Sequence, residues 1–276
     1  MISETLLSAT WTLQVEWRPP GRLRHREPGS YTAPVLGHRL VIVGDAHLGA
    51  APTRSEGALL EFLEAIPSLG DCLLITGDLF DFWFAYRRAI PRRGFAVASA
   101  LATLRHKVPI AMVGGNHDRW GDSFWDRECD IRFSGDSLQF QVDSWRVEAL
   151  HGDGVAEVRW TPRMLHRITR HPLASAVFRS LPPDLGMGLV DRMSGQLADS
   201  TRSQEALNQA AAAQQHWAEE HLRDHANVDL LVMGHTHRAT VSEINQGRWY
   251  VNPGAWLDGH QYAIASPDGI HLERFG

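Results

Sequence analysis

From residue 38 onward, short apolar runs take turns with longer stretches in which apolar residues recur at helical spacing. The runs Leu40–Val43, Cys72–Ile75 and Pro109–Val113 have the length and composition of buried strands. Between them, Thr53–Ile66 and Phe95–Leu104 have the pattern of helices that bury one face. Strands that alternate with helices in this way predict an α/β core with at least some parallel pairing.

The second half of the chain predicts a hairpin, a helical block and a closing set of strands. Leu138–Val142 and Trp145–Leu150 alternate apolar and polar positions, as the two strands of a hairpin do. Residues at about 155–227 then have mostly helical spacing, and we interpret them as an inserted helical lid that ends in a long helix over Ser203–Ala226. Further strands are predicted at Asp229–Met233, Thr240–Ile244, Arg248–Val251, Tyr262–Ala265 and Ile270–Arg274.

Residues 1–37 differ in composition from the rest of the chain. Pro, Arg and Gly gather at Pro19–Arg26 and again at Pro28–Pro34, which favours a poorly ordered or loosely docked extension. A short extra strand around Trp11–Trp17 is the alternative. The predicted organisation is therefore an N-terminal extension over residues 1–37 and one domain over residues 38–276 that contains the lid.

Composition narrows the class of protein. The 276 residues, of which 43% are hydrophobic, suffice for one sizeable core. A net charge of -5 argues against non-specific binding of duplex DNA, so we expect no nucleic-acid partner, although a local basic pocket for an anionic substrate remains compatible with it. The two cysteines form no CxxC pair, and no apolar run approaches the roughly 18 residues of a membrane span. We expect a soluble protein.

Polar residues cluster where the predicted core strands end. Each of these strands stops at a glycine next to Asp, Asn or His. In layered α/β sheets the carboxyl ends of the strands face one crevice, where ligands bind, so we expect these side chains to meet. The five segments are Gly44-Asp45-Ala46-His47, Gly77-Asp78-Leu79-Phe80-Asp81, Gly115-Asn116-His117-Asp118, His151-Gly152-Asp153 and Gly234-His235-Thr236-His237.

The side chains in these segments form a coherent set of metal ligands. Imidazole suits Zn, Fe and Mn, whereas carboxylate and amide oxygens suit Mn and Mg. Residues two apart in an extended segment point the same way, so Asp45 and His47 are expected to bind together, as are His235 and His237. The donors exceed what one tetrahedral ion needs and suit two ions that clamp a phosphate for in-line displacement. They are Asp45, His47, Asp78, Asn116, His151, His235 and His237.

From about residue 38 to the end, this series of motifs resembles the calcineurin-like metallophosphoesterase family. The resemblance implies a four-layer α/β/β/α metallophosphoesterase sandwich with an inserted helical lid, and two divalent metal ions, with Mn²⁺ expected and Fe or Zn as alternatives. It also implies that His117 acts beside the scissile phosphate as general acid or electrostatic stabiliser, with Asp118 orienting its imidazole. The first ion is implied to bind Asp45, His47, Asp78 and His237, and the second Asp78, Asn116, His151 and His235.

The residues around these motifs are similar to one group within that family, the UDP-2,3-diacylglucosamine diphosphatases. That resemblance implies cleavage of the pyrophosphate of a lipid-A precursor, with release of UMP and a lipid monophosphate, and a lid inserted after the His-Gly-Asp motif. The best-defined lipid-A enzymes have Arg where this chain has His117, and His is the commoner choice in the wider superfamily. The similar segments are Gly77–Phe84, Asp118-Arg119-Trp120, His151–Gly154, Gly234–Arg238 and Asn252-Pro253-Gly254.

The expected activity is metal-dependent hydrolysis of a phosphoester or pyrophosphate bond by a metal-bridging hydroxide. A small anionic phosphoester is the expected partner, with a nucleotide-linked glycolipid as the leading substrate class. A general phosphodiesterase or nucleotide phosphatase on the same fold is one alternative, and a non-catalytic scaffold is another, against which the retained Asn116, His117 and His151 argue. The expected location is the cytoplasm, and peripheral contact of the lid with the inner membrane stays open.

Charged residues near the motifs have two interpretations each. In the lid, Arg159, Arg163, Arg167 and Arg170 lie near helical spacing, and they either bind phosphate or a lipid surface or form a solvated face paired with acids. The same choice applies to Arg87, Arg88, Arg92 and Arg93, where we favour a solvated loop. Asp81 and Asp153 either support the metal ligands or cap a turn.

Overall fold

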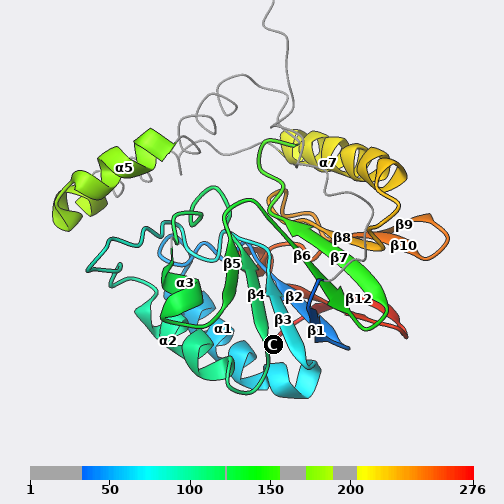
Figure 1. Ribbon diagram of the computed structural model, residues 1–276, viewed down its shortest axis with the longest axis horizontal. Coiled ribbons are helices and arrows are strands. Elements are labelled where there is room, and N and C mark those ends of the chain that lie inside the picture. The colour runs from blue at the N-terminus through cyan, green and yellow to red at the C-terminus, as the bar shows by residue number, and fades with distance from the viewer. Residues whose placement is uncertain (1–32, 122, 156–171, 189–203) are drawn as a thin grey trace, which may run out of the picture. The chain divides into compact units, whose positions relative to one another are not determined.

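Two six-stranded sheets form the centre of the computed structural model, which describes residues 33–121, 123–155, 172–188 and 204–276 (Figure 1). The first, sheet A, has the order β1-β6-β7-β8-β10-β9, and the second, sheet B, has the order β12-β11-β2-β3-β4-β5. Sheet A contains β1 (Val35–Gly37), β6 (Ser137–Val142), β7 (Trp145–Leu150), β8 (Leu230–Val232), β9 (Thr240–Asn245) and β10 (Arg248–Asn252). Sheet B contains β2 (Leu40–Val43), β3 (Cys72–Ile75), β4 (Ile110–Val113), β5 (Arg132–Ser134), β11 (Gln261–Ser266) and β12 (Gly269–Arg274).

Sheet B has a parallel core. Strands β2, β3, β4 and β5 pair in parallel, and β11 adds to β2 in the antiparallel direction. Helices α1 (Thr53–Leu69) and α2 (Phe95–Leu104) are the connections from β2 to β3 and from β3 to β4. The predicted α/β alternation with parallel pairing is therefore confirmed.

Alternate residues of β2 are buried on opposite faces of sheet B, which shows how the layers are stacked. Val41 and Val43 belong to the core that sheet B shares with α1 and α2. Leu40 and Ile42 point the other way, into the core between the two sheets. A third core lies on the outer face of sheet A, beneath α7 (Gln204–Asp224). The layers are thus helix, sheet, sheet and helix, which confirms the predicted four-layer architecture (Figure 1).

Several boundaries differ from the predicted ones by one or two residues, and two differ by three. β1 begins at Val35 and pairs in parallel with β6, so the sheet starts inside the segment that we assigned to the extension. A three-residue strand is too short to produce a periodic pattern, which explains the error. Helix α1 continues three residues past the predicted end at Ile66, because the Gly70 N–H closes the last turn on the Ile66 carbonyl at 2.9 Å. The alternative strand at Trp11–Trp17 lies outside the described residues.

Sequence periodicity also missed three short elements. They are α3 (Phe124–Arg127), β5 and the 3-10 turn η1 (Trp256–Asp258). Each spans only three or four residues, which is less than the window over which hydrophobic periodicity becomes visible. One of the three, η1, reaches a predicted ligand, because its Asp258 lies 3.5 Å from Nδ1 of His237.

The described parts of the helical block are α5 (Pro172–Ser180), residues 181–188 and α7. In α5 the ring of Phe178 lies 4.7 Å from that of Phe84 and 5.7 Å from that of Phe82. In α7, Ala218 and Leu222 pack on the outer face of sheet A. The last helix of the predicted insertion therefore supplies the outer helical layer. No helix among the described residues is long and apolar enough to cross a bilayer.

We predict that Leu222→Ala destabilises the whole domain, since Leu222 is fully buried between α7 and sheet A. The lost burial and the remaining cavity should lower the free energy of unfolding by about 2–5 kcal/mol in urea denaturation. Arg223→Ala, at the exposed neighbouring position, should change it by less than about 0.5 kcal/mol. Equal stability of Leu222→Ala and the parent protein would mean that α7 is a separate lid helix.

Candidate metal centre

The carboxyl ends of five strands deliver polar side chains to one region between the sheets. β2, β3 and β4 of sheet B are followed by Asp45, Asp78 and Asn116, and β7 and β8 of sheet A are followed by His151 and His235. The loops that carry them are joined by backbone hydrogen bonds. The Asp45 N–H donates to the Gly77 carbonyl and the His47 N–H to the Asp78 carbonyl, both at 3.0 Å. The Gly234 N–H donates to the His151 carbonyl at 3.0 Å.

The backbone is strained where these side chains attach. Five of the residues have left-handed φ angles, which non-glycine residues rarely adopt and which cost free energy that the surroundings must supply. The segments are therefore not extended, and our reason for pairing Asp45 with His47 and His235 with His237 was wrong. The five residues are Asp45 (φ 50°), His47 (46°), Asp78 (48°), His235 (71°) and His237 (56°).

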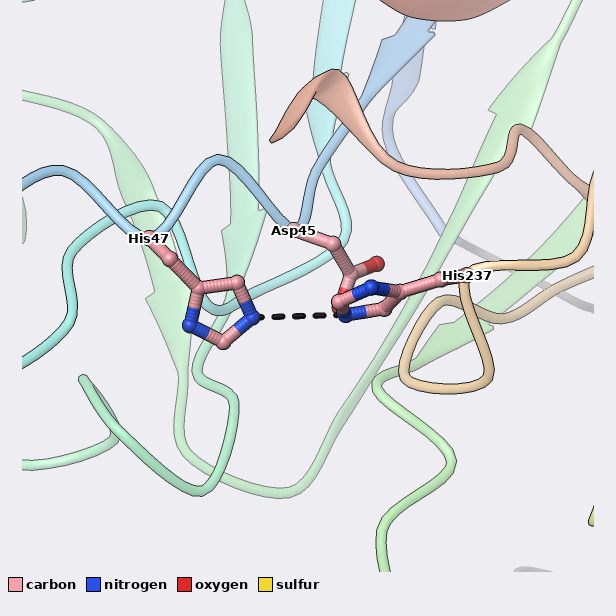
Figure 2. Close-up of side chains that lie close together, drawn as sticks. All are labelled: Asp45, His47 and His237. Atoms are coloured by element: carbon pink, nitrogen blue, oxygen red, sulfur yellow. Dashed lines mark hydrogen bonds and ion pairs between the residues drawn. The ribbon is translucent and has the colours of Figure 1, made fainter. Parts of the chain in front are cut away.

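One group of donor atoms consists of Asp45, His47 and His237, which lie within 4.8 Å of one another. The Nε2 atoms of His47 and His237 face each other at 3.3 Å, and Nε2 of His237 lies 3.4 Å from the Asp45 carboxylate (Figure 2). Asp45 is fully buried, and both of its oxygens accept the His235 backbone N–H at 3.1 Å. This backbone hydrogen bond fixes the orientation of the carboxylate.

A second group consists of Asp78, His151 and His235, all buried and within 4.8 Å of one another. Nε2 of His151 lies 3.3 Å from Asp78 and 3.3 Å from Nδ1 of His235. The other ring nitrogen, Nδ1, donates to the Thr76 carbonyl at 2.8 Å, so Nε2 is the atom that faces the group. Asp78 also lies 3.8 Å from Nε2 of His47 and therefore connects the two groups.

Buried carboxylates and imidazoles control one another's charge when no metal ion is bound. Burial disfavours ionised Asp78, but the imidazoles of His151, His117 and His47 outweigh it and hold its pKa well below the usual range. Burial also disfavours charged His151 and His237, yet their carboxylate partners raise each pKa to about 10. His235 is the opposite case, because burial and the charge of His151 lower its pKa to about 3. The site thus balances its anionic charge with protons.

The donor set fits divalent cations better than it fits protons. Two pairs of imidazole nitrogens face each other at 3.3 Å, where one proton at most can serve both atoms of a pair. Oδ1 of Asn116 is buried and has no hydrogen-bond partner among the described residues, which is costly for an amide oxygen. Imidazole nitrogens with carboxylate and amide oxygens are the ligands that Mn, Fe and Zn take in proteins.

His117 lies beside both groups without belonging to the expected ligands. Its ring is 4.9 Å from the ring of His47, and the side chain is 34% exposed. Nδ1 donates to the Asp81 carbonyl at 2.6 Å and lies 3.7 Å from the Asp81 carboxylate, so Nε2 is left for a ligand. Burial opposes protonation, but Asp78 and Asp81 outweigh it and raise the pKa of His117.

Asp118 does not orient the His117 ring, which corrects our expectation from the motif. Its buried carboxylate accepts backbone N–H groups of Leu79 at 2.7 Å, Gly115 at 2.8 Å and Asp78 at 3.1 Å. It therefore ties the loop after β3 to the loop after β4. Asp81 holds the imidazole instead, through its main-chain carbonyl, and a carbonyl contact leaves no signal in the sequence.

Two further carboxylates support the histidines. Asp258, in η1, lies 3.5 Å from Nδ1 of His237, on the side of the ring away from Asp45. Asp153 is buried, pairs with Arg119 at 3.3 Å and helps to raise the pKa of His151. Carboxylates behind metal-binding imidazoles orient the ring and increase its basicity. Our sequence interpretation included Asp153 but missed Asp258, which lies in a short turn outside all five motifs.

The predicted substrate-binding arginines are not brought to the site by the described structure. Arg159, Arg163 and Arg167, with Arg170, lie in the segment 156–171, outside the described residues. The second set of arginines follows the Asp78 motif, and all four are solvent-exposed, as favoured from the sequence. These four are Arg87, Arg88, Arg92 and Arg93.

Comparison with known proteins agrees with this geometry. Residues 38–239, which contain all five motifs, match the model of the calcineurin-like phosphoesterase family. A UDP-2,3-diacylglucosamine hydrolase of Porphyromonas gingivalis is 25% identical over 253 residues, covering 85% of this chain and 97% of that protein. One from Bordetella pertussis is 29% identical over 203 residues, covering 72% and 77%. The chain belongs to the calcineurin-like phosphoesterase family.

Proposed function

We propose that this chain hydrolyses the pyrophosphate bond of a UDP-linked diacyl sugar with the help of two divalent metal ions. Its family implies a hydrolase that uses divalent metal ions. The observation that carries the proposal is the pair of carboxylate–imidazole groups joined through Asp78, with His117 directly beside them. The substrate class follows from the similarity to hydrolases of UDP-2,3-diacylglucosamine over most of the chain.

The residues that would hold the ions follow from the two groups. Asp45, His47 and His237 would hold one ion, His151, His235 and Asn116 the other, and Asp78 both. Two such ions supply positive charge that neutralises the phosphate oxygens and makes water a stronger nucleophile. Mn²⁺ is our preferred metal, because carboxylate and amide oxygens accompany the imidazoles and neither of these two groups of described residues contains a cysteine.

His117 would act on the phosphate from outside the metal ligands. Its Nδ1 is occupied by the Asp81 carbonyl, so its Nε2–H can donate to a phosphate oxygen or to the leaving group. The raised pKa keeps the imidazole protonated at a higher pH than a free histidine. Asp118 would act indirectly, by fixing the loops that present Asp78 and His117.

A phosphodiesterase or nucleotide phosphatase is the second candidate, and His117 favours it. An alcohol leaving group needs a proton, which imidazolium can give. When a pyrophosphate is cleaved, the leaving group is a phosphate monoester, which departs readily without a proton. The related lipid-A enzymes are expected to have an arginine at this position. Its guanidinium stays charged, so it can stabilise negative charge but cannot donate a proton to a leaving group. The side chain in this chain therefore permits esters as well as anhydrides.

We predict release of UMP when the full chain, loaded with Mn²⁺, is incubated with UDP-2,3-diacylglucosamine. Bis(p-nitrophenyl) phosphate serves as the ester probe, and a chelator-treated sample as the blank. Turnover of the ester without UMP release would reject the lipid substrate in favour of the second candidate.

Contact with a membrane is a separate question, and sedimentation of the same protein with anionic vesicles would test it. The surface candidates for this contact are Leu173 and Val177 of α5, which are 68% and 64% exposed.

We predict that His117→Ala loses turnover and keeps its metal ions. Removal of a general acid or charge stabiliser should lower kcat about 10²–10⁴-fold. Metal content by elemental analysis should equal that of the parent protein, since His117 is no expected ligand. His216→Ala, at an exposed histidine of α7, is the control and should keep full activity. Full turnover by His117→Ala would remove His117 from the reaction.

We predict that metal binding releases protons and strengthens as pH rises. In the metal-free protein the pKa of His151 and that of His237 are raised to about 10, so both imidazoles carry protons at neutral pH that a metal ion must displace. Titration calorimetry with Mn²⁺ in buffers of different ionisation enthalpy should show about two protons released when both sites fill. Heats that do not depend on the buffer would contradict this charge assignment.

A further inference from the structure

A polar side chain interrupts the apolar face by which α7 packs on sheet A. Gln214, Ala218 and Leu222 follow one another at intervals of one helical turn, and all three are fully buried. Ala218 and Leu222 contribute to the core beneath α7. Gln214 brings an amide to the same face, and a buried amide costs free energy unless it is hydrogen-bonded. An apolar residue would suffice here if packing were the only requirement.

The amide of Gln214 reaches a loop of the candidate metal centre. Its Nε2 donates to the Gly234 carbonyl at 3.1 Å, and Asn252 donates to the same oxygen at 2.9 Å. This carbonyl belongs to the peptide group between Gly234 and His235. On the other side of that peptide, the His235 N–H donates to the Asp45 carboxylate at 3.1 Å.

A chain of hydrogen bonds therefore runs from the outer helix to a buried carboxylate. A donor on the carbonyl polarises the peptide and strengthens the hydrogen bond made by its N–H. It also fixes the orientation of the peptide plane, which matters because His235 has a left-handed φ of 71°. Gln214 thus acts on the Asp45 oxygens and on the His235 ring through one peptide group.

Gln214 also touches the second loop of the site that comes from sheet A. A Cβ atom on Gly152 would collide with its Nε2, so the amide lies directly against the backbone that follows His151. The Gly234 N–H is bonded in turn to the His151 carbonyl. The one side chain therefore packs against both loops that carry the histidines of the Asp78 group.

We propose that Gln214 is a positioning residue for metal binding: it holds the Gly234–His235 peptide, and through it Asp45 and His235, in the geometry that receives divalent cations. This inference rests on the proposed metal-dependent function. It gives α7 a second role besides its packing, because the helix that ends the predicted insertion becomes part of the support of the metal centre.

The test compares Gln214→Met with Gln215→Met in the full chain. Methionine keeps the length of the side chain and removes the donor. Gln215, the next residue of the same helix, donates to Glu219 of α7 at 3.4 Å and provides the matched control. Each protein is stripped with a chelator, and Mn²⁺ binding is then measured by calorimetry. Gln214→Glu, which keeps the shape but cannot donate when ionised, gives a second variant if Gln214→Met does not fold.

We expect Gln214→Met to bind Mn²⁺ about 10-fold more weakly than the parent chain, in the range known for groups that support metal ligands. Thermal unfolding of the metal-free variant should stay near that of the parent, and kcat should fall while KM is kept. Gln215→Met should match the parent in every measurement. Equal Mn²⁺ affinity of Gln214→Met and the parent would overturn this inference alone. Absence of Mn²⁺ binding by the parent would overturn the proposed function as well.

Discussion

The structure depends on the compensation of two buried negative charges. Asp45 and Asp78 are almost inaccessible to water, and an isolated carboxylate there would cost far more free energy than folding provides. Imidazoles compensate them in the metal-free chain, which is why the pKa of His151 and that of His237 rise. The left-handed backbone of both aspartates adds to this cost. Buried charge and backbone strain at the same residues are typical of a binding site, where a bound ligand provides the stabilisation that the fold alone does not.

The stacking of two sheets provides the means of bringing these groups together. Parallel strands within each sheet place their carboxyl ends on the same side, and the apolar core between the sheets fixes how those two edges meet. Neither sheet alone holds the group that contains Asp78, because Asp78 comes from sheet B, whereas His151 and His235 come from sheet A. Formation of the site is therefore coupled to packing between the sheets, and a change in that core would move the donors apart.

Much of the fold could be predicted from the sequence, because its signals are local. Leu40–Val43, Cys72–Ile75 and Phe95–Leu104 have the predicted bounds, since their mostly apolar residues lie between polar or glycine residues that mark where each element begins and ends. The gathering of the polar segments followed from the rule for strand ends. Contacts made through the main chain could not be predicted, such as the Asp81 carbonyl on His117, because they depend on how separate loops meet. The left-handed angles were missed for the same reason.

The helix α7 shows why an insertion in the sequence need not be a separate part in space. A strictly mobile lid would keep its polar groups exposed or satisfied within itself, yet Gln214 is fully buried and donates to a carbonyl of the core domain. His221, two turns further on, bonds to the buried Glu148 of β7 at 3.0 Å. Release of α7 would take His221 away from the buried Glu148 and would remove one of the two donors to the Gly234 carbonyl, and both losses cost free energy in a dry environment. The helix α7 is therefore anchored to the sheet that presents His151 and His235, as the other elements of the core domain are.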